Sequence, residues 1–553
     1  MATARIGSGS AARRALDLLL GIAMAGTFLL AAASSGLSFT WKHEFAAPSW
    51  ALALAAVIVA GFLVAAPVRR GGTRNGALAR FAGSWRMPAF MAMALFAWQA
   101  YAALQIRFLG DYDQRVIYQA AYDLVTAGHV SDYTVGYLSR YPNNAMLLSI
   151  ESVALGALKA AGALTFDRGV AALCLLNAAV AVATGAMLHG AVRRVAGSRM
   201  AVLAWLPYLL LCGASPWFLV PYSDSLAICA PIAVAWLMTL EPASRGGRVA
   251  RDACMGAVAW LGYSLKPQVV FILVGAVAVI SLRAWADRRR GAIRDGEGPG
   301  ALRAAALRLA CIAAGLALAM GLGGACATLA TSRIPTDPEG AFSPAHYLMM
   351  GLNEQTDGTF SDADSQFSRA IPGKGARAAA DLGVAADRLG DMGPFGLLKH
   401  LVRKQLVTWS DGTFGWKHDR AYFGEPMRVP SAGPAALYWG AIRADGRASA
   451  VLTCAQQVAW LVVLLAMAAG GIARFAGARA WCPDSGGGGA AKPSHTGIIP
   501  AATAAILLLM AFELTFEAGA RYLYAYVPIM ILVACAGISE PRLRIRQLRE
   551  GRR

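Results

Sequence analysis

The segment 87–106 is a run of 20 residues without a charged side chain. Such a run is long enough to cross the hydrocarbon core of a bilayer as an α-helix, whose backbone hydrogen bonds are satisfied within the segment. Comparable apolar runs recur along the chain, at 15–35, 50–66, 169–191, 200–220, 223–240, 253–265, 267–285, 304–330, 449–473, 497–516 and 522–539. The sequence therefore predicts an all-α polytopic membrane protein with about twelve transmembrane helices.

The charge distribution separates a membrane protein from a nucleic-acid-binding protein. Hydrophobic residues make up 57% of the chain, charged residues 15%, and the net charge is +19. The segment 331–450 carries 13 acidic and 13 basic residues and is neutral. The basic excess lies instead in short stretches beside the apolar runs, at 69–86, 193–199, 245–251, 288–294 and 542–553. It is a topology signal with some attraction to anionic membrane lipids, and we expect no nucleic-acid partner.

The same arginines orient the chain. Because basic loops stay in the cytoplasm, the arginines before Met87 predict that the helix 87–106 runs outward and that the chain emerges outside at Arg107. Applied to every loop, this rule predicts a multi-pass protein of the cell membrane with both termini in the cytoplasm. The first apolar run is longer than the apolar core of a signal peptide, so we expect an uncleaved first helix.

Two apolar stretches need a separate interpretation. The stretch 253–285 has basic loops at both ends and is broken at Lys266–Pro267, which predicts a two-helix hairpin with the break at the outer surface. The segment 143–163 carries Glu151 and Lys159, and we expect it to lie in the outer interface or to be re-entrant.

These assignments divide the chain into five regions. They are two N-terminal helices with a basic loop (1–86), a transmembrane core (87–330) that contains a first outer loop (107–168), a large extracytoplasmic loop domain (331–448), the C-terminal transmembrane helices (449–540), and a basic cytoplasmic tail (541–553).

The first outer loop opens with a D-x-D pair, Asp111 and Asp113, directly after the span 87–106. Two carboxylates this close can hold a divalent cation such as Mg²⁺ or Mn²⁺, or one can act as a base while the other tunes its pKa. A solvated loop would also carry such a pair. The position at the membrane surface favours chemistry on a lipid-borne substrate, with Asp111 and Asp113 as catalytic candidates.

Three cations are candidates for a phosphate-binding site. Arg140 precedes Pro142 at the start of a helix, where free N–H groups attract anions. Lys266 interrupts apolar sequence and needs an anionic partner or access to headgroups. Arg521 follows Glu517 at the last outer turn and either pairs with it or donates a fork to phosphate. Snorkelling to the interface is the alternative for Arg140 and Lys266.

Other polar residues of the predicted outer face are candidates for substrate binding. Asp224 either caps a helix or contacts substrate, and His346 either meets a phosphate or sugar hydroxyl or has a structural role. The remaining candidates flank the cations, and they are Tyr141, Asn143, Glu517 and Tyr522.

The order of these features resembles the multi-pass GT-C glycosyltransferases, the group that includes protein O-mannosyltransferases and lipid A aminoarabinose transferases. The features are an outer D-x-D after a span, Tyr141-Pro142 before an interfacial helix, Lys266-Pro267 in a broken hairpin, and a late Arg521-Tyr522-x-Tyr524. The stretch HYLMMGLNEQTDGTFS, which begins at His346, is similar to a subgroup of bacterial GT-C-like membrane proteins.

This resemblance, which covers roughly residues 87–540, implies a GT-C-like fold and a polyprenyl-phosphate sugar donor. It implies that Asp111 or Asp113 activates an acceptor hydroxyl or helps to bind metal, and that Lys266 and Arg521 lie near the donor phosphate. The chain departs from the simplest family pattern by having two spans before the D-x-D span and its large loop before the last three spans. These departures leave the acceptor open among envelope glycan, lipid and protein.

The function expected from the sequence is therefore an inverting membrane glycosyltransferase that moves a sugar from a polyprenyl-phosphate donor to an acceptor hydroxyl at the outer face. Two alternatives remain: a transporter or flippase of a lipid-linked sugar, and a non-catalytic subunit of an envelope-polymer complex. Transporters place ionisable residues near the bilayer midplane and often contain repeats, whereas here the charges gather at one face.

Overall fold

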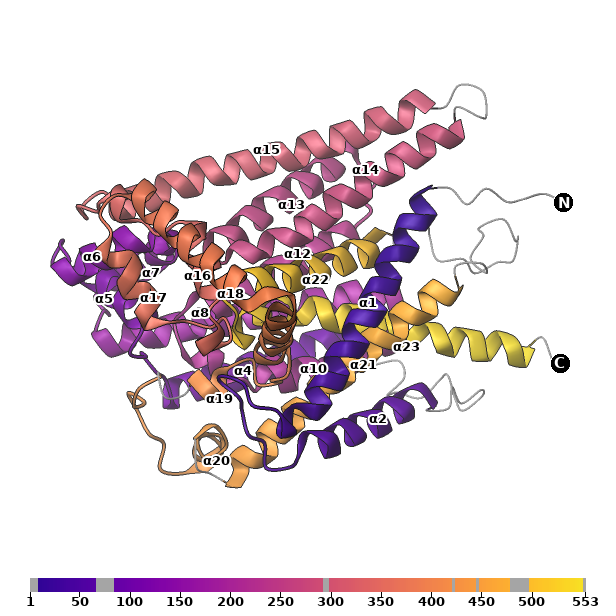
Figure 1. Cartoon of the computed structure of the whole chain (residues 1–553), viewed down its shortest axis with the longest axis horizontal. Coiled ribbons are helices and arrows are strands. Elements are labelled where there is room, and N and C mark those ends of the chain that lie inside the picture. The colour runs from indigo at the N-terminus through magenta and orange to yellow at the C-terminus, as the bar shows by residue number, and fades with distance from the viewer. Residues whose placement is uncertain are drawn as a thin grey trace.

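The computed structural model of the chain describes residues 8–65, 84–291, 298–419, 423–443, 447–477 and 497–550 (Figure 1). These residues form helices, turns and loops, with no strand among them. The helices are α1 (Ser8–Ala33), α2 (Ser49–Ala65), α4 (Arg86–Gln105), α5 (Asp113–Thr126), α6 (Asp132–Arg140), α7 (Ala145–Ala160), α8 (Phe166–Ala196), α9 (Ser198–Leu203), α10 (Trp205–Tyr208), α11 (Ser223–Ala227), α12 (Cys229–Met238), α13 (Arg245–Leu265), α14 (Phe271–Gly291), α15 (Gly298–Thr331), α16 (Pro344–Gly351), α17 (Asp362–Ala370), α18 (Lys374–Trp409), α19 (Trp416–Asp419), α20 (Gly433–Ile442), α21 (Arg447–Gly477), α22 (Ile498–Thr515) and α23 (Val527–Glu550).

The apolar helices make this an all-helical polytopic membrane protein with about eight candidate spans. Eight helical segments of the described chain are long and apolar enough to cross a membrane, and they are Ala11–Gly36, Arg86–Gln105, Phe166–Ala196, Pro267–Arg288, Gly300–Thr331, Ala448–Ala476, Ile498–Thr515 and Ala520–Ser539. Three more apolar helices, at Ser49–Val64, Ser198–Gly213 and Ser223–Met238, are shorter.

The predicted number of about twelve is therefore higher than the structure shows. All twelve predicted segments contain helix, but the segment 253–265 belongs to α13, which begins with Arg245, Arg248, Arg251 and Asp252 and is too polar for a candidate span. The segment 200–220 is interrupted, because α10 is followed by a π-helical turn over Leu209–Gly213 and a 3-10 turn over Pro216–Leu219.

The broken hairpin is present at the predicted residue. α13 ends at Leu265, a 3-10 turn covers Pro267–Val270, and α14 begins at Phe271. Pro267 has no N–H group to continue a helix, which explains the break. The Tyr526 hydroxyl donates a hydrogen bond to the Gln268 carbonyl oxygen at 2.9 Å and so fixes the turn against the last span.

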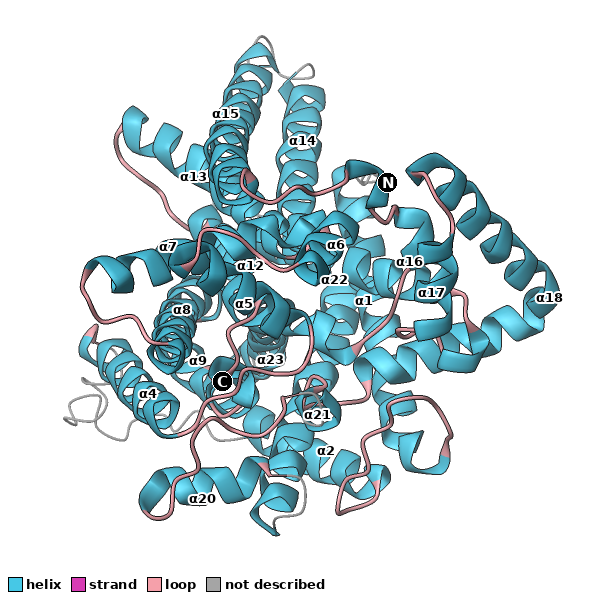
Figure 2. Ribbon diagram, turned by 90° about the vertical axis from the view of Figure 1, so that its left-hand side faces the viewer, coloured by secondary structure: helices cyan, strands magenta, loops and turns pink. Residues whose placement is uncertain are grey.

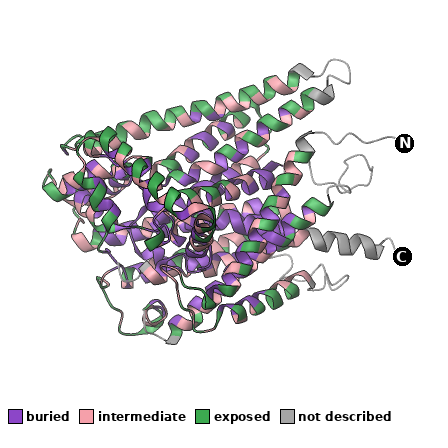
Figure 3. Cartoon of the chain, in the orientation of Figure 1, coloured by how far each residue is buried: buried purple, intermediate pink, exposed green. Residues whose placement is uncertain are grey.

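The two ends of the bundle differ in what they carry. α5, α6, α7, α16 and α17 lie at one end, called here the Asp113 end, whereas α1 begins and α23 ends at the opposite end (Figure 1). Burial is uneven across the bundle: the span Ala520–Ser539 is the most enclosed, whereas α15 runs along the outside with few buried residues (Figure 3).

α7 lies across the ends of the spanning helices at the Asp113 end (Figure 2). It packs on α5, α8 and α15. Glu151 belongs to the segment expected to lie in the outer interface or to be re-entrant; it is 1% exposed, and neither of its carboxylate oxygens has a hydrogen-bond partner among the described residues. The buried face of α7 contains this acid because α5 and α15 cover it, a contact that the segment's own sequence does not reveal.

The long helix α18 is docked onto the end of α22. It is kinked at Gly393, whose φ of 56° is left-handed, directly before Pro394, and the kink divides it into two arms. In the second arm, Lys404 donates hydrogen bonds to the carbonyl oxygens of Gly351, at 2.7 Å, and Phe516, at 2.6 Å. A side chain at Gly351 would meet the Thr515 carbonyl oxygen at 2.5 Å, so α16 approaches α22 closely only because this residue is glycine.

Candidate functional site

The path of the chain into the segment 107–168 is fixed by the residues that follow α4. The Arg107 guanidinium forms an ion pair with Asp167 at the start of α8, with its Nε 2.8 Å from Oδ1. The Phe108 N–H donates to the Leu219 carbonyl oxygen at 3.1 Å. The chain then enters α5 at Asp113, whose carboxylate lies in the first turn, where the helix dipole favours negative charge.

Asp113 is held by two tyrosines. The Tyr222 hydroxyl donates a hydrogen bond to Asp113 Oδ2 at 2.9 Å. Tyr137 also forms a hydrogen bond with this carboxylate, and its hydroxyl accepts one from Asn144 Nδ2 at 2.8 Å. Burial, with Asp113 adding to it, raises the pKa of both phenols well above the usual value, so both stay protonated donors at neutral pH. The half-buried carboxylate is therefore held in a fixed orientation.

Asp111 has a different environment. Its side chain is exposed and pairs with Arg115, four residues on, at 3.0 Å. Mg²⁺ demands oxygen ligands in octahedral geometry and commonly takes one or two carboxylates with substrate phosphates. The two carboxylates have separate partners, and among the described residues no group of three or more His, Cys, Asp and Glu could hold a metal ion. A cation shared by Asp111 and Asp113 therefore stays a prediction, which would need ligands from the substrate in addition to these two carboxylates.

Lys266 and Asp224 form a buried ion pair. Lys266 Nζ lies 3.0 Å from Asp224 Oδ2, and the two residues are 9% and 2% exposed. The lysine Nζ also lies 5.2 Å from the ring centroid of Tyr222 and 5.4 Å from that of Tyr522. Asp224 makes no side-chain capping bond to α11, so the capping alternative was wrong. Lys266 is fixed by its partner instead of snorkelling, and the Tyr222 ring joins it to Asp113.

Glu517, Arg521 and Tyr522 form a third group at the end of α22. The Tyr522 hydroxyl donates to Glu517 Oε1 at 2.6 Å, and the Arg521 guanidinium lies 5.3 Å from the centre of the Tyr522 ring. Burial raises the pKa of the Glu517 carboxyl group. The hydrogen bond from Tyr522 and the charge of Arg521 oppose this shift, and the Asp113 carboxylate adds to it. A second carboxyl group, protonated more readily than usual, therefore lies near Asp113.

A fourth group joins the segment 107–168 to α17. The Tyr141 hydroxyl lies close to the side chains of Ser365 and Arg369, and burial, followed by the Asp113 carboxylate, raises the pKa of Tyr141. Arg140 has a buried Nε without a hydrogen-bond partner among the described residues. Burial and the neighbouring Arg369 lower the pKa of Arg140. Two arginines near each other beside a buried tyrosine suit an anion.

Two predicted substrate-binding residues lie apart from these groups. Asn143 is exposed, and its neighbour Asn144 is the residue that contacts Tyr137. His346 is 1% exposed, its Nδ1 lies 2.7 Å from the Ser368 hydroxyl, and its ring stacks on Phe342 at 4.0 Å. Burial lowers the pKa of His346 to about 4, so the ring is neutral and packs against residues of the segment 331–448.

Sequence reasoning did not single out five residues that complete the site, and these are Tyr137, Tyr222, Tyr347, Ser365 and Arg369. Apart from Tyr137, whose partners are close in the sequence, their positions depend on contacts between segments more than eighty residues apart, such as α5 with Tyr222 and Tyr141 with α17. The one available signal was the number of tyrosines next to outer-face carboxylates, which an interfacial aromatic belt explains equally well.

Comparisons with known proteins give a family and a weak similarity to solved structures. A family model described as "conserved hypothetical integral membrane protein" matches residues 9–479. No curated protein matches the chain. Among solved structures, ArnT from Cupriavidus metallidurans bound to undecaprenyl phosphate is 13% identical, and the alignment covers 83% of this chain and 78% of that chain, with a TM-score of 0.29. A TM-score this low carries no argument about the fold or activity of the present chain.

Proposed function

The chain belongs to the family of conserved hypothetical integral membrane proteins, and from this premise and the geometry around Asp113 we propose that it is a membrane glycosyltransferase. It would transfer a sugar from a polyprenyl-phosphate donor to an acceptor hydroxyl at the outer face of the cell membrane. The observation that carries the proposal is one carboxylate, oriented by two tyrosine hydroxyls, with a lysine and an arginine close by at the end of a bundle of membrane helices.

In the proposed reaction Asp113 accepts the proton of the acceptor hydroxyl. The acceptor oxygen attacks the anomeric carbon, and the bond from that carbon to the phosphate oxygen breaks. Polyprenyl phosphate leaves with the electron pair, and the configuration at the anomeric carbon is inverted. Base assistance of this kind accelerates a reaction roughly 10²- to 10⁴-fold.

The developing charge on the lipid phosphate needs fixed positive charge nearby. Arg521 supplies a planar fork suited to two phosphate oxygens. Lys266 is partly neutralised by Asp224 at 3.0 Å, so it would contribute less charge than an unpaired lysine. Arg140, with the neighbouring Arg369, would bind a second anionic group, on the donor or on the acceptor.

The remaining members of the site have supporting roles in this proposal. Tyr141, Glu517 and Tyr522 would contact the sugar or the acceptor, and Asp224 would position Lys266. Asn143 could meet an acceptor arriving from solvent, whereas the enclosed ring of His346 leaves it no place in the reaction.

The experiment is direct. Purified protein in lipid nanodiscs is incubated with a panel of radiolabelled polyprenyl-phosphate sugars and a crude envelope acceptor fraction, and the release of free polyprenyl phosphate is measured. Release from one donor, dependent on the acceptor, supports the transferase and identifies the sugar. Binding of donors without release from any of them would contradict it and favour a transporter or a non-catalytic subunit.

A further inference from the structure

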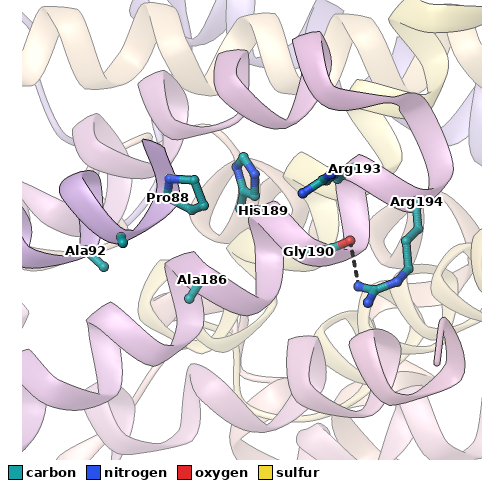
Figure 4. A pocket seen from close by; sticks show the side chains of 8 residues that line it. Pro88, Ala92, Ala186, His189, Gly190, Arg193 and Arg194 are labelled. Carbon is teal, nitrogen blue, oxygen red and sulfur yellow. Dashed lines mark hydrogen bonds between the residues drawn. The ribbon is translucent and has the colours of Figure 1, made fainter. Parts of the chain in front are cut away.

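A second basic site lies at the other end of α4. A cavity of about 670 Å³ separates the beginning of α4 from the end of α8 (Figure 4). The α8 side of the cavity is lined by residues three or four positions apart, so that their side chains share one face of the helix; these are Ala186, His189, Arg193 and Arg194. The opposite wall is made of Pro88 and the small residues Ala89 and Ala92, whose short side chains leave this space between the two helices unfilled.

The cations of this cavity lack acidic partners. Arg193 and Arg194 are both exposed, and neither forms an ion pair with an acidic residue in the part of the chain that the structure describes. The Arg194 guanidinium donates only to the Gly190 carbonyl oxygen of its own helix, at 3.1 Å (Figure 4). Two adjacent guanidinium groups without a carboxylate favour an anion, and phosphate matches their fork geometry.

His189 adds a donor to the same wall. It is 5% exposed, and its Nδ1 lies 3.2 Å from Trp205 Nε1 and 3.1 Å from the Ala201 carbonyl oxygen. These contacts fix the ring, while Nε2 has no hydrogen-bond partner among the described residues. The His189 ring is thus buried and held at one nitrogen, while its other nitrogen lacks a partner among the described residues. The cavity offers space for a ligand that could bind this second nitrogen.

The rest of the lining is apolar and borders the membrane. Ala89, Ala92 and Ala186 carry no polar side-chain atom, and α4 and α8 are both candidate spans. On the outer face of α4, Phe90 is 55% exposed and Met93 is 65% exposed, as suits residues that face hydrocarbon. A ligand that fills this cavity therefore has an anionic group and an apolar chain.

We propose that this cavity binds the phosphate ester of a membrane lipid. The site is distinct from the Asp113 site, because α4 has 20 residues and so separates the two by about 30 Å. Arg193 and Arg194 would hold the phosphate, His189 would donate to it, and the chain would lie beside α4. The ligand is either a phospholipid headgroup or a polyprenyl phosphate, since both present the same chemistry.

Native mass spectrometry of the delipidated full-length protein tests the proposal. Phosphatidylglycerol, phosphatidylcholine, polyprenyl phosphate and the uncharged polyprenol are titrated separately. The double variant Arg193→Gln/Arg194→Gln should weaken binding of the preferred phosphate lipid about tenfold or more, since charge-assisted hydrogen bonds are lost. The matched double variant Arg245→Gln/Arg248→Gln, with the same change in charge, should bind as the wild type does.

A cavity-filling variant separates a site from general attraction. Ala92→Leu leaves the charge unchanged and should also weaken binding, whereas diffuse attraction to basic loops would be unaffected. A preference for phosphatidylglycerol supports the proposal with a phospholipid as ligand, and a preference for polyprenyl phosphate supports it with that lipid. Equal binding of polyprenol and polyprenyl phosphate, or wild-type binding by the Arg193→Gln/Arg194→Gln variant, overturns it.

Discussion

The Tyr222 hydroxyl is the group that most directly orients the Asp113 carboxylate. Tyr222→Phe removes the 2.9 Å hydrogen bond but keeps the ring that contacts Lys266. A hydrogen bond to a charged group contributes about 1.5–3 kcal/mol, so we expect turnover to fall about tenfold or more while stability changes little. The measurement is the initial rate of polyprenyl phosphate release, with the exposed Tyr263→Phe as control. Unchanged turnover in Tyr222→Phe would remove this tyrosine from the site.

The ion pair between Lys266 and Asp224 is predicted to have separable effects on stability and transfer. Lys266→Met leaves a buried carboxylate without its cation, which typically costs about 3–5 kcal/mol. The double variant Lys266→Met/Asp224→Asn removes that isolated charge, so we expect it to unfold at a higher temperature than Lys266→Met alone. Transfer should stay impaired in both variants, because the cation near the leaving group is absent. A double variant no more stable than Lys266→Met would show that the pair is not coupled.

Among the elements, the docking of α18 on α22 depends on a buried amine. Lys404 is fully buried against two carbonyl oxygens, and burial lowers its pKa to about 7, although the carboxyl groups of Glu513 and Glu517 oppose the shift. In the unfolded chain the pKa of this lysine is near 10.5, so between pH 7 and 10.5 the unfolded state binds more protons than the folded state. Lys404 therefore destabilises the folded state at the lower end of this pH window, and the free energy of unfolding rises with pH across it.

We expect the unfolding temperature of the wild type, relative to that of Lys404→Met, to increase from pH 7 to pH 9. Thermal unfolding of the two proteins in the same detergent checks this difference, because all other titrating groups are common to both. A difference that is constant with pH, or that decreases, would mean that the Lys404 amine is not deprotonated more readily than usual in the folded protein.

The helices themselves followed from local sequence, and their contacts did not. Uncharged runs and Pro267 predicted the helices and the broken hairpin, although not the number of candidate spans, because backbone hydrogen bonding in a membrane depends on the segment itself. The burial of Glu151 on α7 depends on which neighbours cover its side chain. The same is true of the D-x-D pair, in which Asp111 pairs with Arg115 and Asp113 accepts a hydrogen bond from Tyr222. Tyr141 and Tyr522 were named as candidates from the sequence, whereas Tyr222 was not, since Tyr222 and Asp113 are brought together only by the packing of the bundle.

At the scale of the whole molecule, the two basic and polar ends of the bundle should face opposite sides of the membrane. The N-terminal ends of α6 and α13 carry Asp132 and Arg245, and the basic loops predict that the first lies outside and the second in the cytoplasm. In a cysteine-free background, Asp132→Cys should react with a membrane-impermeant maleimide in intact cells, and Arg245→Cys should react only after lysis. Labelling of Arg245→Cys in intact cells would reverse the orientation and place the Asp113 site in the cytoplasm.

The central claim is that Asp113, and not its neighbour Asp111, is the base of a transferase. The measurement is single-turnover release of polyprenyl phosphate from the donor identified with the wild type, for Asp113→Asn, Asp111→Asn and the exposed control Asp132→Asn. We expect Asp113→Asn to be slower by roughly 10²- to 10⁴-fold and the other two to stay within a few-fold of the wild type. Equal rates for Asp113→Asn and the wild type would contradict the account.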